Sequence, residues 1–418
     1  MSFGKIGVVG MGYIGLPTAA VLAATNREVV GIDINENVVE TINRGDIHIV
    51  EPGLARLVSE AVRQGYLRAT TRPEICDAYI IAVPTPYHPN DHSADLRYVD
   101  AACASLAPLL KAGDLVVLES TSPPGTTARI AQAFAKMRPD LIFPTSSTAP
   151  QVHIAYCPER ILPGKALEEL VANDRVIGGY TRTCSERAYE LYKLFVNGDC
   201  IIASNPHTAE MAKLAENSYR DVNIAFANEL SLICDQLDID VWELIQLMNR
   251  HPRVNVLQPG PGVGGHCIAV DPWFIVSAAP ATARLIATAR AVNDSKPLWV
   301  LEKIDEAISS YVTNNNITDV GDVSIAIYGL TFKPNIDDLR DSPALEIART
   351  LSKKHRGPIK VLEPNISALP SGLENAHLVN CSECPAAAVH VLLVDHAQFK
   401  NMVPTSEYVV DTRGLWRN

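Results

Sequence analysis

The chain has 418 residues, of which 47% are hydrophobic and 20% are charged. At about 150 residues per domain this length predicts two to three domains, and the composition is that of globular proteins, which excludes disordered and fibrous classes. The formal net charge of −11 excludes a general attraction to nucleic acid or to anionic membranes, so we expect neither as a partner. An anionic ligand must therefore be held by local arginines and backbone amides.

Nine cysteines are an odd number in a chain long enough to build large cores, which does not fit a disulfide-stapled secreted domain. No apolar run in the sequence approaches the roughly 18 residues that cross a bilayer, and the N-terminal residues do not resemble a signal peptide. We therefore expect a cytoplasmic protein with reduced thiols.

The first 200 residues alternate short β-branched runs with helical stretches, which indicates a parallel sheet wrapped by helices. The runs are 6–9, 29–33, 79–83, 115–118, 154–156 and 175–178. A long helix is then predicted from Pro206, because Asn205 and Pro206 supply a cap and a first turn and no glycine or proline follows until Pro252. Polar residues at 235–240 predict a turn.

The segment 251–271 holds three prolines and four glycines, a composition typical of a functional loop that approaches a ligand closely. Helical character returns over 281–310, and we interpret the polar break at 313–318 as a domain linker. Later β-branched runs predict a second, smaller α/β domain; they lie at 325–328, 360–362, 389–394 and 408–410. The predicted domains are 1–203, 204–312 and 313–418.

Three glycines, Gly10, Gly12 and Gly15, form a G-x-G-x-x-G turn between the first strand and a helical run. The second strand ends in Asp33, eighteen residues beyond Gly15, where a carboxylate accepts from both hydroxyls of an adenosine ribose. That carboxylate would repel a 2′-phosphate, so the pattern predicts NAD rather than NADP, with the pyrophosphate on the amides at the helix start. The alternative is a glycine turn of an unrelated α/β fold with a surface aspartate.

Further cofactor contacts are expected from residues in the glycine turn and after the later strands. Tyr13 and Ile14 lie inside the turn, Thr85 follows the third strand, and Thr121 and Thr127 follow the fourth. The carboxyl ends of parallel strands line the ligand crevice of such sheets, and Thr121 is also a candidate for the catalytic set. Ordinary capping of strand ends explains such threonines equally well.

Lys213, Asn217 and Arg220 project from one face of the long helix, because they are spaced by four and three residues. A lysine and an amide one turn apart can bind one substrate oxygen together, and a desolvated lysine shifts its pKa readily. The alternative is a solvated charged face.

Cys267 directly follows the glycine-rich loop, where backbone amides can lower a thiol pKa and hold an oxyanion. A nucleophilic thiolate beside a dinucleotide is the apparatus for oxidising an aldehyde through a thiohemiacetal to a thioester. Glu159, at the end of a strand, is the candidate for activating the hydrolytic water. The alternatives are an inert buried thiol and a glutamate in a structural ion pair.

Other clusters predict no chemistry. Cys381 and Cys384 form a Cys-x-x-Cys without a second pair at zinc spacing or a thioredoxin-like context, so we interpret the motif as incidental. The eleven histidines show no metal-ligand pattern, and no metal is predicted.

Six ordered motifs make the chain resemble the UDP-glucose/GDP-mannose dehydrogenase family over essentially its whole length. They lie at 10–15, 120–125, 157–160, 213–217, 264–271 and 329–340. The wording at 154–160, 173–179, 251–255 and 259–271 is most similar to members that oxidise UDP-N-acetyl-D-mannosamine, so the expected substrate is a UDP-N-acetylhexosamine.

The resemblance implies oxidation of a C6 alcohol to a carboxylate by two NAD molecules in succession, in members that supply surface polysaccharides. By motif match, Cys267 resembles the nucleophile, Lys213 with Asn217 the acid/base and oxyanion group, and Glu159 the assistant in hydrolysis. Asp271 resembles a partner that orients Lys213 or water.

The implied architecture has two Rossmann-like α/β domains, one binding NAD and one binding the UDP-sugar, joined by a long-helix central domain that forms a homodimer. His251 and Arg253 are expected to reach the neighbouring subunit's pocket. The positions that line the nucleotide-sugar pocket in the family correspond here to Arg160, Ile161, Lys213, Asn217, Arg220, His251, Arg253, Gly264, Phe332, Lys333 and Arg340.

One departure concerns the sugar. UDP-glucose dehydrogenases carry Pro-Glu-Phe-Leu-x-Glu where this chain has Pro158-Glu-Arg-Ile-Leu-Pro163, so proline replaces a second carboxylate and glucose is put in doubt. Two other readings stay open. A β-hydroxyacid dehydrogenase shares the first domain and the Lys-x-x-x-Asn but makes one oxidation without a cysteine, and a nucleotide-sugar or NAD sensor would keep the fold without turnover.

Overall fold

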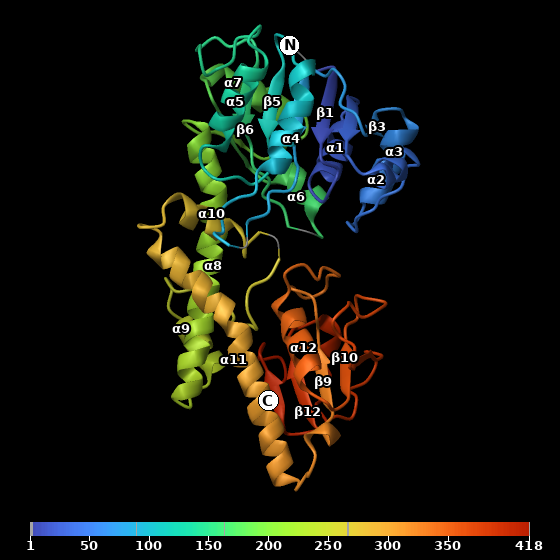
Figure 1. Ribbon diagram of the computed structural model, residues 1–418, viewed down its shortest axis with the longest axis vertical. Coiled ribbons are helices and arrows are strands. Elements are labelled where there is room, and N and C mark those ends of the chain that lie inside the picture. The colour runs from blue at the N-terminus through green and yellow to red at the C-terminus, as the bar shows by residue number, and fades with distance from the viewer. Residues whose placement is uncertain (1–2, 89, 163, 266, 418) are drawn as a thin grey trace. The chain divides into compact units, whose positions relative to one another are not determined.

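A computed structural model describes residues 3–88, 90–162, 164–265 and 267–417. The chain divides into two compact units, Met1–Glu216 and Asn217–Asn418, and the division falls inside one long helix, α8 (Pro206–Gln236) (Figure 1). The domain boundaries at 203 and 312 stay a prediction. Among the residues described, no helix is long and apolar enough to cross a membrane.

The first unit is built on an eight-stranded sheet with the order β3-β2-β1-β4-β5-β6-β7-β8. Each predicted strand is present within two residues of its expected ends, whereas β3 and β8 are not among the predicted strands. The strands are β1 (Lys5–Val9), β2 (Glu28–Ile32), β3 (Leu67–Thr70), β4 (Ala78–Ile81), β5 (Leu115–Leu118), β6 (His153–Tyr156), β7 (Arg175–Gly179) and β8 (Cys200–Ile202).

The expectation of a parallel sheet is wrong at one place, because β6 and β7 run antiparallel. The connection between them carries only the short helix α6 (Ala166–Ala172), so β7 starts near the edge of the sheet where β6 ends. This reversal places the first residue of β7, Arg175, beside the loop that follows β6.

Helices cover both faces of this sheet, and its central strands are therefore buried on both sides. One apolar core joins the sheet to α1 (Gly15–Ala23), α2 (Glu36–Asn43), α3 (Leu54–Arg63) and α7 (Arg182–Tyr192). A second core joins the opposite face to α4 (Arg97–Leu106) and α5 (Thr126–Met137).

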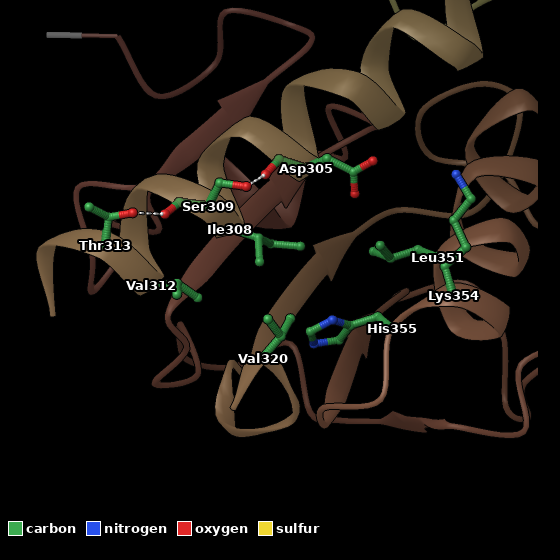
Figure 2. Close-up of a pocket in the computed structure, with 9 residues that line it drawn as sticks. All are labelled: Asp305, Ile308, Ser309, Val312, Thr313, Val320, Leu351, Lys354 and His355. Atoms are coloured by element: carbon green, nitrogen blue, oxygen red, sulfur yellow. Dashed lines mark hydrogen bonds between the residues drawn. The ribbon is translucent and has the colours of Figure 1, made fainter. Parts of the chain in front are cut away.

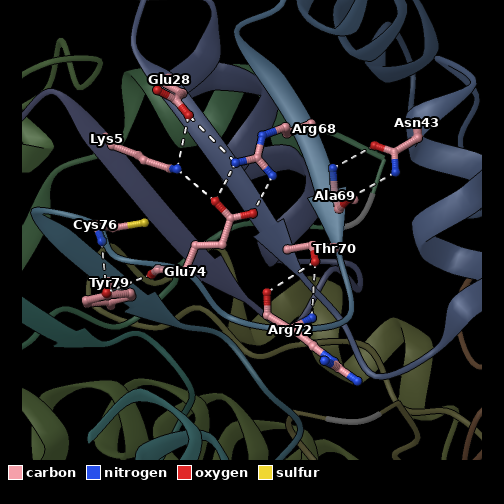
Figure 3. A network of polar contacts seen from close by, with 10 residues as sticks. All are labelled: Lys5, Glu28, Asn43, Arg68, Ala69, Thr70, Arg72, Glu74, Cys76 and Tyr79. Carbon is pink, nitrogen blue, oxygen red and sulfur yellow. Dashed lines mark hydrogen bonds and ion pairs between the residues drawn. The ribbon is translucent and has the colours of Figure 1, made fainter. Parts of the chain in front are cut away.

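The edge strand β3 buries Leu67 and Ala69 in the core, and polar groups surround its other residues, as Figure 3 shows. Glu74 accepts from Lys5 Nζ at 2.8 Å and from Arg68 Nη1 at 2.6 Å, and the bonds from Arg68 and then Lys5 lower the pKa of Glu74 to about 2. Asn43 of α2 donates to the carbonyl of Ala69 at 2.9 Å and accepts from its amide at 2.7 Å. A strand built on such contacts has no apolar run to mark it in the sequence.

The second unit combines the rest of α8 with three further helices, α9 (Val241–Met248), α10 (Asp271–Ala278) and α11 (Arg284–Asn314). The cap predicted for α8 is confirmed, since the Asn205 side chain accepts from the amide of Thr208 at 2.9 Å. The predicted turn at 235–240 separates α8 from α9, and the helix α10 is not among the predicted elements.

A five-stranded parallel sheet completes the second unit, with the order β11-β10-β9-β12-β13. The C-terminal half of α11 and the helix α12 (Pro343–Lys354) pack on this sheet in one apolar core. The segment expected to be a linker therefore includes the end of a helix packed on the sheet. The strands are β9 (Ile325–Tyr328), β10 (Ile359–Leu362), β11 (Ala376–Leu378), β12 (Val389–Leu392) and β13 (Val409–Asp411).

A polar seam joins α8 to α11. Arg290 of α11 donates to Asp221 of α8 at 2.7 Å, and both side chains are buried. Further along, Lys296 is also buried and donates to Ser231 Oγ at 2.6 Å. Burial disfavours the charged ammonium and lowers the pKa of Lys296 to about 7.

We predict that Lys296→Met stabilises the protein at neutral pH and below, and that this gain falls as the pH rises. Between pH 7 and 10 the unfolded chain holds the Lys296 proton more tightly than the folded chain, so the stability of the native protein rises with pH in this window. Methionine lacks this titration, so its advantage should shrink by about 2 kcal/mol between pH 7 and pH 9. Melting temperatures of both proteins across this range measure the difference.

The control is Lys303→Met, which removes a lysine of the same helix that pairs with Asp235 at 2.7 Å and keeps a raised pKa. This variant should show no such pH-dependent gain. A gain at Lys296→Met that stays constant with pH would contradict the prediction.

Candidate functional site

The predicted dinucleotide residues of the first unit gather at one edge of its sheet. The strands β1, β2, β4, β5 and β6 are mutually parallel, so their carboxyl ends meet at the same edge. The residues that follow these ends are, in order, Gly10, Asp33, Thr85, Thr121 and Glu159.

The glycine turn has a steric reason at two of its three glycines, Gly10 and Gly15. Gly10 has a φ of +89°, and a Cβ there would lie 2.6 Å from the carbonyl oxygen of Ala82. A Cβ on Gly15 would lie 1.8 Å from the carbonyl oxygen of Gly10, so α1 can start this close to β1 only with glycine. Around Gly12 no atom lies within 4 Å of such a Cβ, which leaves open space for a ligand.

Asp33 is half-buried and fixed by backbone amides. Its Oδ2 accepts from the amide of Met11 and its Oδ1 from the amide of Asn35, both at 2.9 Å. Each carboxylate oxygen has a further lone pair, which suits it to accept from ribose hydroxyls. Tyr13 is exposed and Ile14 half-buried in the adjoining turn.

The three threonines differ in their surroundings. Thr85 donates to the carbonyl of Thr121 at 2.6 Å, which ties the loops after β4 and β5 together. Thr127, in the first turn of α5, is fully buried and donates to Glu210 Oε1 at 2.6 Å. Glu210 also accepts from the amides of Gly125 and Thr127, as a carboxylate does at a helix N-terminus. Thr127 therefore has a structural role, and its contact with the cofactor stays a prediction.

Glu159 belongs to a buried charged cluster that the sequence motifs did not indicate. Its Oε2 accepts from Arg175 Nη1 at 2.7 Å and its Oε1 from the amide of Arg160 at 2.6 Å. A second carboxylate, Glu119, lies 3.8 Å from Arg175 Nη1 and accepts from Tyr192 at 3.3 Å. Burial and the nearby charge of Glu159 raise the pKa of Glu119, which favours the protonated form of this carboxyl.

The signal for Glu119 and Arg175 in the sequence was weak. Each is a charged residue at the end of an apolar run, which is common where a strand reaches the surface. Their burial follows from the reversal at β7, and a buried charge with few partners marks a specialised site.

Three further predicted residues of the first unit lie near this cluster or on α8. The guanidinium of Arg160 pairs with Glu216 at 2.7 Å and donates to the carbonyl of Asp174 at 3.3 Å, while Ile161 is half-buried beside it. Lys213 is buried on α8, one helical turn before Asn217. Pro163, on which the doubt about glucose rests, lies outside the described residues.

In the second unit, the structure brings Asn217 to Asp271 and places Cys267 close by in the chain. Asn217 Nδ2 donates to Asp271 Oδ2 at 2.5 Å. Asp271 is buried at the start of α10, and its amide donates to the carbonyl of Cys267 at 2.9 Å. The Cys267 side chain is exposed. The start of α10 thus holds a carboxylate close in the chain to a thiol, and the amide side chain of Asn217 reaches that carboxylate from α8.

The loop before Cys267 packs against the second sheet's first loop, and this contact unites three predicted residues. A Cβ on Gly264 would lie 2.4 Å from the carbonyl of Asp341, and one on Gly265 would lie 2.8 Å from the ring of Phe332. The amide of Gly265 donates to the carbonyl of Arg340 at 3.3 Å. Glycine is required here because Gly264 lies against backbone, and Gly265 lies against an aromatic ring with a φ of +84°.

Two residues that sequence reasoning missed anchor the start of this loop. Asn228 of α8 accepts from the amide of Gly260 at 2.9 Å and donates to Asn293 of α11 at 2.9 Å. Arg413, after β13, donates to the carbonyl of Pro259 at 3.0 Å. Only the folded chain shows these contacts, because the partners lie far apart in the sequence.

The remaining predicted residues are more open. Arg220 is exposed on α8, and His251 and Arg253 are exposed in the turn that follows α9. Lys333 is half-buried next to Phe332, and Arg340 pairs with Asp338 at 2.6 Å. These positions stay predictions for the nucleotide-sugar pocket.

A pocket of about 390 Å³ in the second unit lies elsewhere, between α11 and α12 (Figure 2). It contains none of the predicted site residues. Its walls are formed by Asp305, Ile308, Ser309, Val312, Thr313, Val320, Leu351, Lys354 and His355.

Family models of known proteins match three consecutive parts of the chain. The models of the UDP-glucose/GDP-mannose dehydrogenase family match in order: the NAD binding domain at residues 4–196, the central domain at 207–295 and the UDP binding domain at 326–418. The resemblance found in the sequence motifs is thereby confirmed.

Individual relatives match over the full length. A UDP-N-acetyl-D-mannosamine dehydrogenase of Yersinia pestis is 56% identical, with all of both chains covered. An NDP-N-acetyl-D-galactosaminuronic acid dehydrogenase of Ralstonia nicotianae is also 56% identical, with all of this chain and 97% of the other covered. The solved structure of the S. aureus UDP-N-acetyl-mannosamine dehydrogenase is 38% identical and superposes with a TM-score of 0.86, covering 99% of this chain and 96% of that one. The chain belongs to the UDP-glucose/GDP-mannose dehydrogenase family.

Proposed function

We propose that this protein oxidises UDP-N-acetyl-D-mannosamine at C6 to UDP-N-acetyl-D-mannosaminuronate in two NAD-dependent steps, as a donor for surface polysaccharides. The observation that carries the proposal is the exposed Cys267 at the start of α10, beside the Asn217–Asp271 pair and on a loop packed against Phe332 of the UDP binding domain. The Yersinia pestis and S. aureus relatives support the choice of sugar.

The glycine turn fits NAD, because Gly12 leaves room for a pyrophosphate and the backbone amides that hold Asp33 leave its oxygens lone pairs for ribose hydroxyls. When bound there, NAD supplies the hydride acceptor. The residues of this chain then have to transfer protons, bind the aldehyde and prevent its release between the two oxidations.

In the first oxidation, Lys213 accepts the proton of the C6 hydroxyl as C6 loses its hydride. Lys213 is buried, so little bulk water competes with a substrate oxygen for its amino group. Asn217, one turn further along α8, donates to the same oxygen and is itself oriented by Asp271. A hydrogen-bonded oxygen with a cation beside it lowers the barrier for hydride loss.

In the second oxidation, the Cys267 thiolate adds to the aldehyde carbon and forms a thiohemiacetal, whose oxyanion Lys213 and Asn217 stabilise. Loss of the second hydride gives a thioester on Cys267. Water then attacks the thioester carbonyl, the carbon–sulfur bond breaks, and the carboxylate product leaves with the thiolate regenerated.

Glu159 serves the hydrolysis, in our proposal, by orienting water rather than as a freely moving base. Both of its oxygens are already fixed, one by Arg175 and one by the amide of Arg160. Each oxygen retains a lone pair for a water molecule, and the charge of Arg175 offsets that of Glu159 inside the buried cluster.

We also propose a homodimer formed through α8. Tyr219, Phe226 and Ile233 recur every seven residues, so they lie along one side of the helix, and their exposed fractions are 73%, 47% and 44%. An apolar stripe of this kind on a long helix suits an isologous interface with a second copy. His251 and Arg253 are exposed and would then serve the partner's pocket.

Wild-type enzyme should form two NADH for each UDP-N-acetyl-D-mannosamine consumed, and Cys267→Ser should lose this activity because serine is a far weaker nucleophile at neutral pH. NADH absorbance against residual sugar measures the ratio. UDP-N-acetylgalactosamine, UDP-N-acetylglucosamine, UDP-glucose and GDP-mannose are compared in parallel, since the Ralstonia nicotianae relative acts in galactosamine chemistry. One NADH per sugar, or indifference to Cys267, would favour a single-step dehydrogenase.

Glu159→Gln should slow hydrolysis while sparing both hydride transfers. We expect a rapid burst of about two NADH per site followed by slow turnover, with the acyl group trapped on Cys267 and visible as added mass. Glu216→Gln, which loosens Arg160 without touching Glu159, is the control and should show no burst. A structural ion pair alone predicts lower stability of Glu159→Gln without accumulation of thioester.

Mixed dimers test the shared pocket. Cys267→Ser and Arg253→Ala are each expected to be inactive, yet refolding them together should restore about a quarter of wild-type activity, because half of the dimers then hold one intact pocket. The pair Cys267→Ser and Lys213→Ala should restore none, since both residues belong to one pocket. Phe226→Glu should give a monomer in light scattering, and a dimer that persists would argue against the α8 interface.

A further inference from the structure

The second sheet repeats the ligand-binding turn of the first at atomic detail. Gly10 and Gly329 follow the first strand of each sheet with φ values of +89° and +88°. The amide of Gly10 donates to the carbonyl of Ile32 at 2.8 Å, and that of Gly329 donates to the carbonyl of Leu362 at 2.8 Å. In both sheets the glycine thus bonds to the end of the neighbouring strand.

The acidic residue after that neighbouring strand is also repeated. Glu363 follows β10 as Asp33 follows β2, and its Oε2 accepts from the amide of Leu330 at 2.7 Å, just as Asp33 Oδ2 accepts from Met11. Its Oε1 accepts from the amide of Asn365 at 3.1 Å, in the manner of Asn35 with Asp33. Glu363 therefore has the place that a ribose-binding carboxylate has in the first sheet.

The two carboxylates differ in what faces them. Glu363 is only 2% exposed, and His396 Nε2 lies 3.0 Å from its Oε2. The other ring nitrogen, Nδ1, accepts from the amide of Asn335 at 2.9 Å, so Nε2 carries the proton and donates to Glu363. Burial raises the pKa of Glu363, but the bonds from His396 and the backbone amides outweigh it and leave the pKa below its usual value.

The same pair holds both ends of one loop. Glu363 binds the amides of Leu330 and Thr331, and His396 binds the amide of Asn335. Between these anchors the loop presents Phe332, whose ring packs on Gly265 of the loop that leads to Cys267. The fully buried His396 therefore fixes the position of the predicted uridine-nucleotide contacts.

We propose that the buried side chain of His396 fills the position at Glu363 that a ribose takes in a dinucleotide-binding sheet. The Glu363–His396 pair thereby holds the loop 330–335 in the conformation that binds the UDP part of the substrate. This proposal rests on the proposed function. The second sheet is thereby closed to an adenosine ribose and specialised for a uridine nucleotide.

The experiment measures binding of UDP and of NAD to the full-length protein by calorimetry. His396→Leu should weaken UDP about tenfold, the scale of one or two lost hydrogen bonds that order a loop, and should leave NAD binding unchanged. The Michaelis constant for the UDP-sugar should rise with little change in kcat. His396→Gln, which keeps a donor and an acceptor, should recover part of the affinity.

The matched control is His390→Leu, which removes a buried histidine of β12 that bonds to Tyr328 rather than to the loop. It should lower the melting temperature without changing UDP affinity. Glu363→Asp, a milder change, should weaken UDP in the same direction and serves if His396→Leu does not fold. Unchanged UDP affinity in the variants would overturn the positioning role while leaving the proposed function intact, and a wild-type protein that binds no UDP would overturn both.

Discussion

The buried ion pair between Asp221 and Arg290 is the interaction on which the second unit's site depends. It joins α8 to α11, two helices of 31 residues each, at a point where both side chains are excluded from water. Removing one partner of such a pair leaves an uncompensated charge, at a cost of about 3–5 kcal/mol. Asn293 donates to the same carboxylate and accepts from Asn228. Asn228 in turn accepts from the amide of Gly260 and so holds the glycine-rich loop in place. These contacts thus fix the position of the loop that bears Cys267 relative to the helix that bears Asn217.

The parts of the fold that could be predicted are those whose burial requires a recognisable pattern of apolar residues in the sequence. The central strands are apolar on both faces, so β1, β2, β4 and β5 are evident as runs, and the Asn205 cap marks the start of α8. The missed strands lie at or near an edge, and β3 is stabilised by Glu74, Arg68 and Asn43 rather than by an apolar core on both faces. The antiparallel direction of β7 could not be predicted either, because the alternation of strands and helices does not show whether a connection crosses over the sheet.

The site divides in a similar way. Residues within local motifs, such as Gly10, Asp33 and Cys267, could be named from spacing because their chemistry depends on neighbours in the chain. Glu119, Arg175 and His396 could not, because each acquires its role from a partner dozens of residues away and is hidden inside the fold. Arg175 contacts the predicted site residue Glu159 and His396 contacts the loop that carries Phe332, and a charged or titratable residue that becomes buried carries no sequence signature of its own. The motifs therefore predict which residues act, whereas the structure shows what holds them in place.

The contact of Asn43 with Ala69 has a consequence for the folding chain. The amide and carbonyl of Ala69 point away from β2, at the open edge of the sheet, where an unpaired strand invites another chain to add to it. Asn43 satisfies both groups with a single side-chain amide and so takes the place of a further strand. The charges of Arg68 and Glu74 beside it add a second obstacle to strand addition. This edge is thereby protected against aggregation, at the side of the sheet that no other part of the first unit extends.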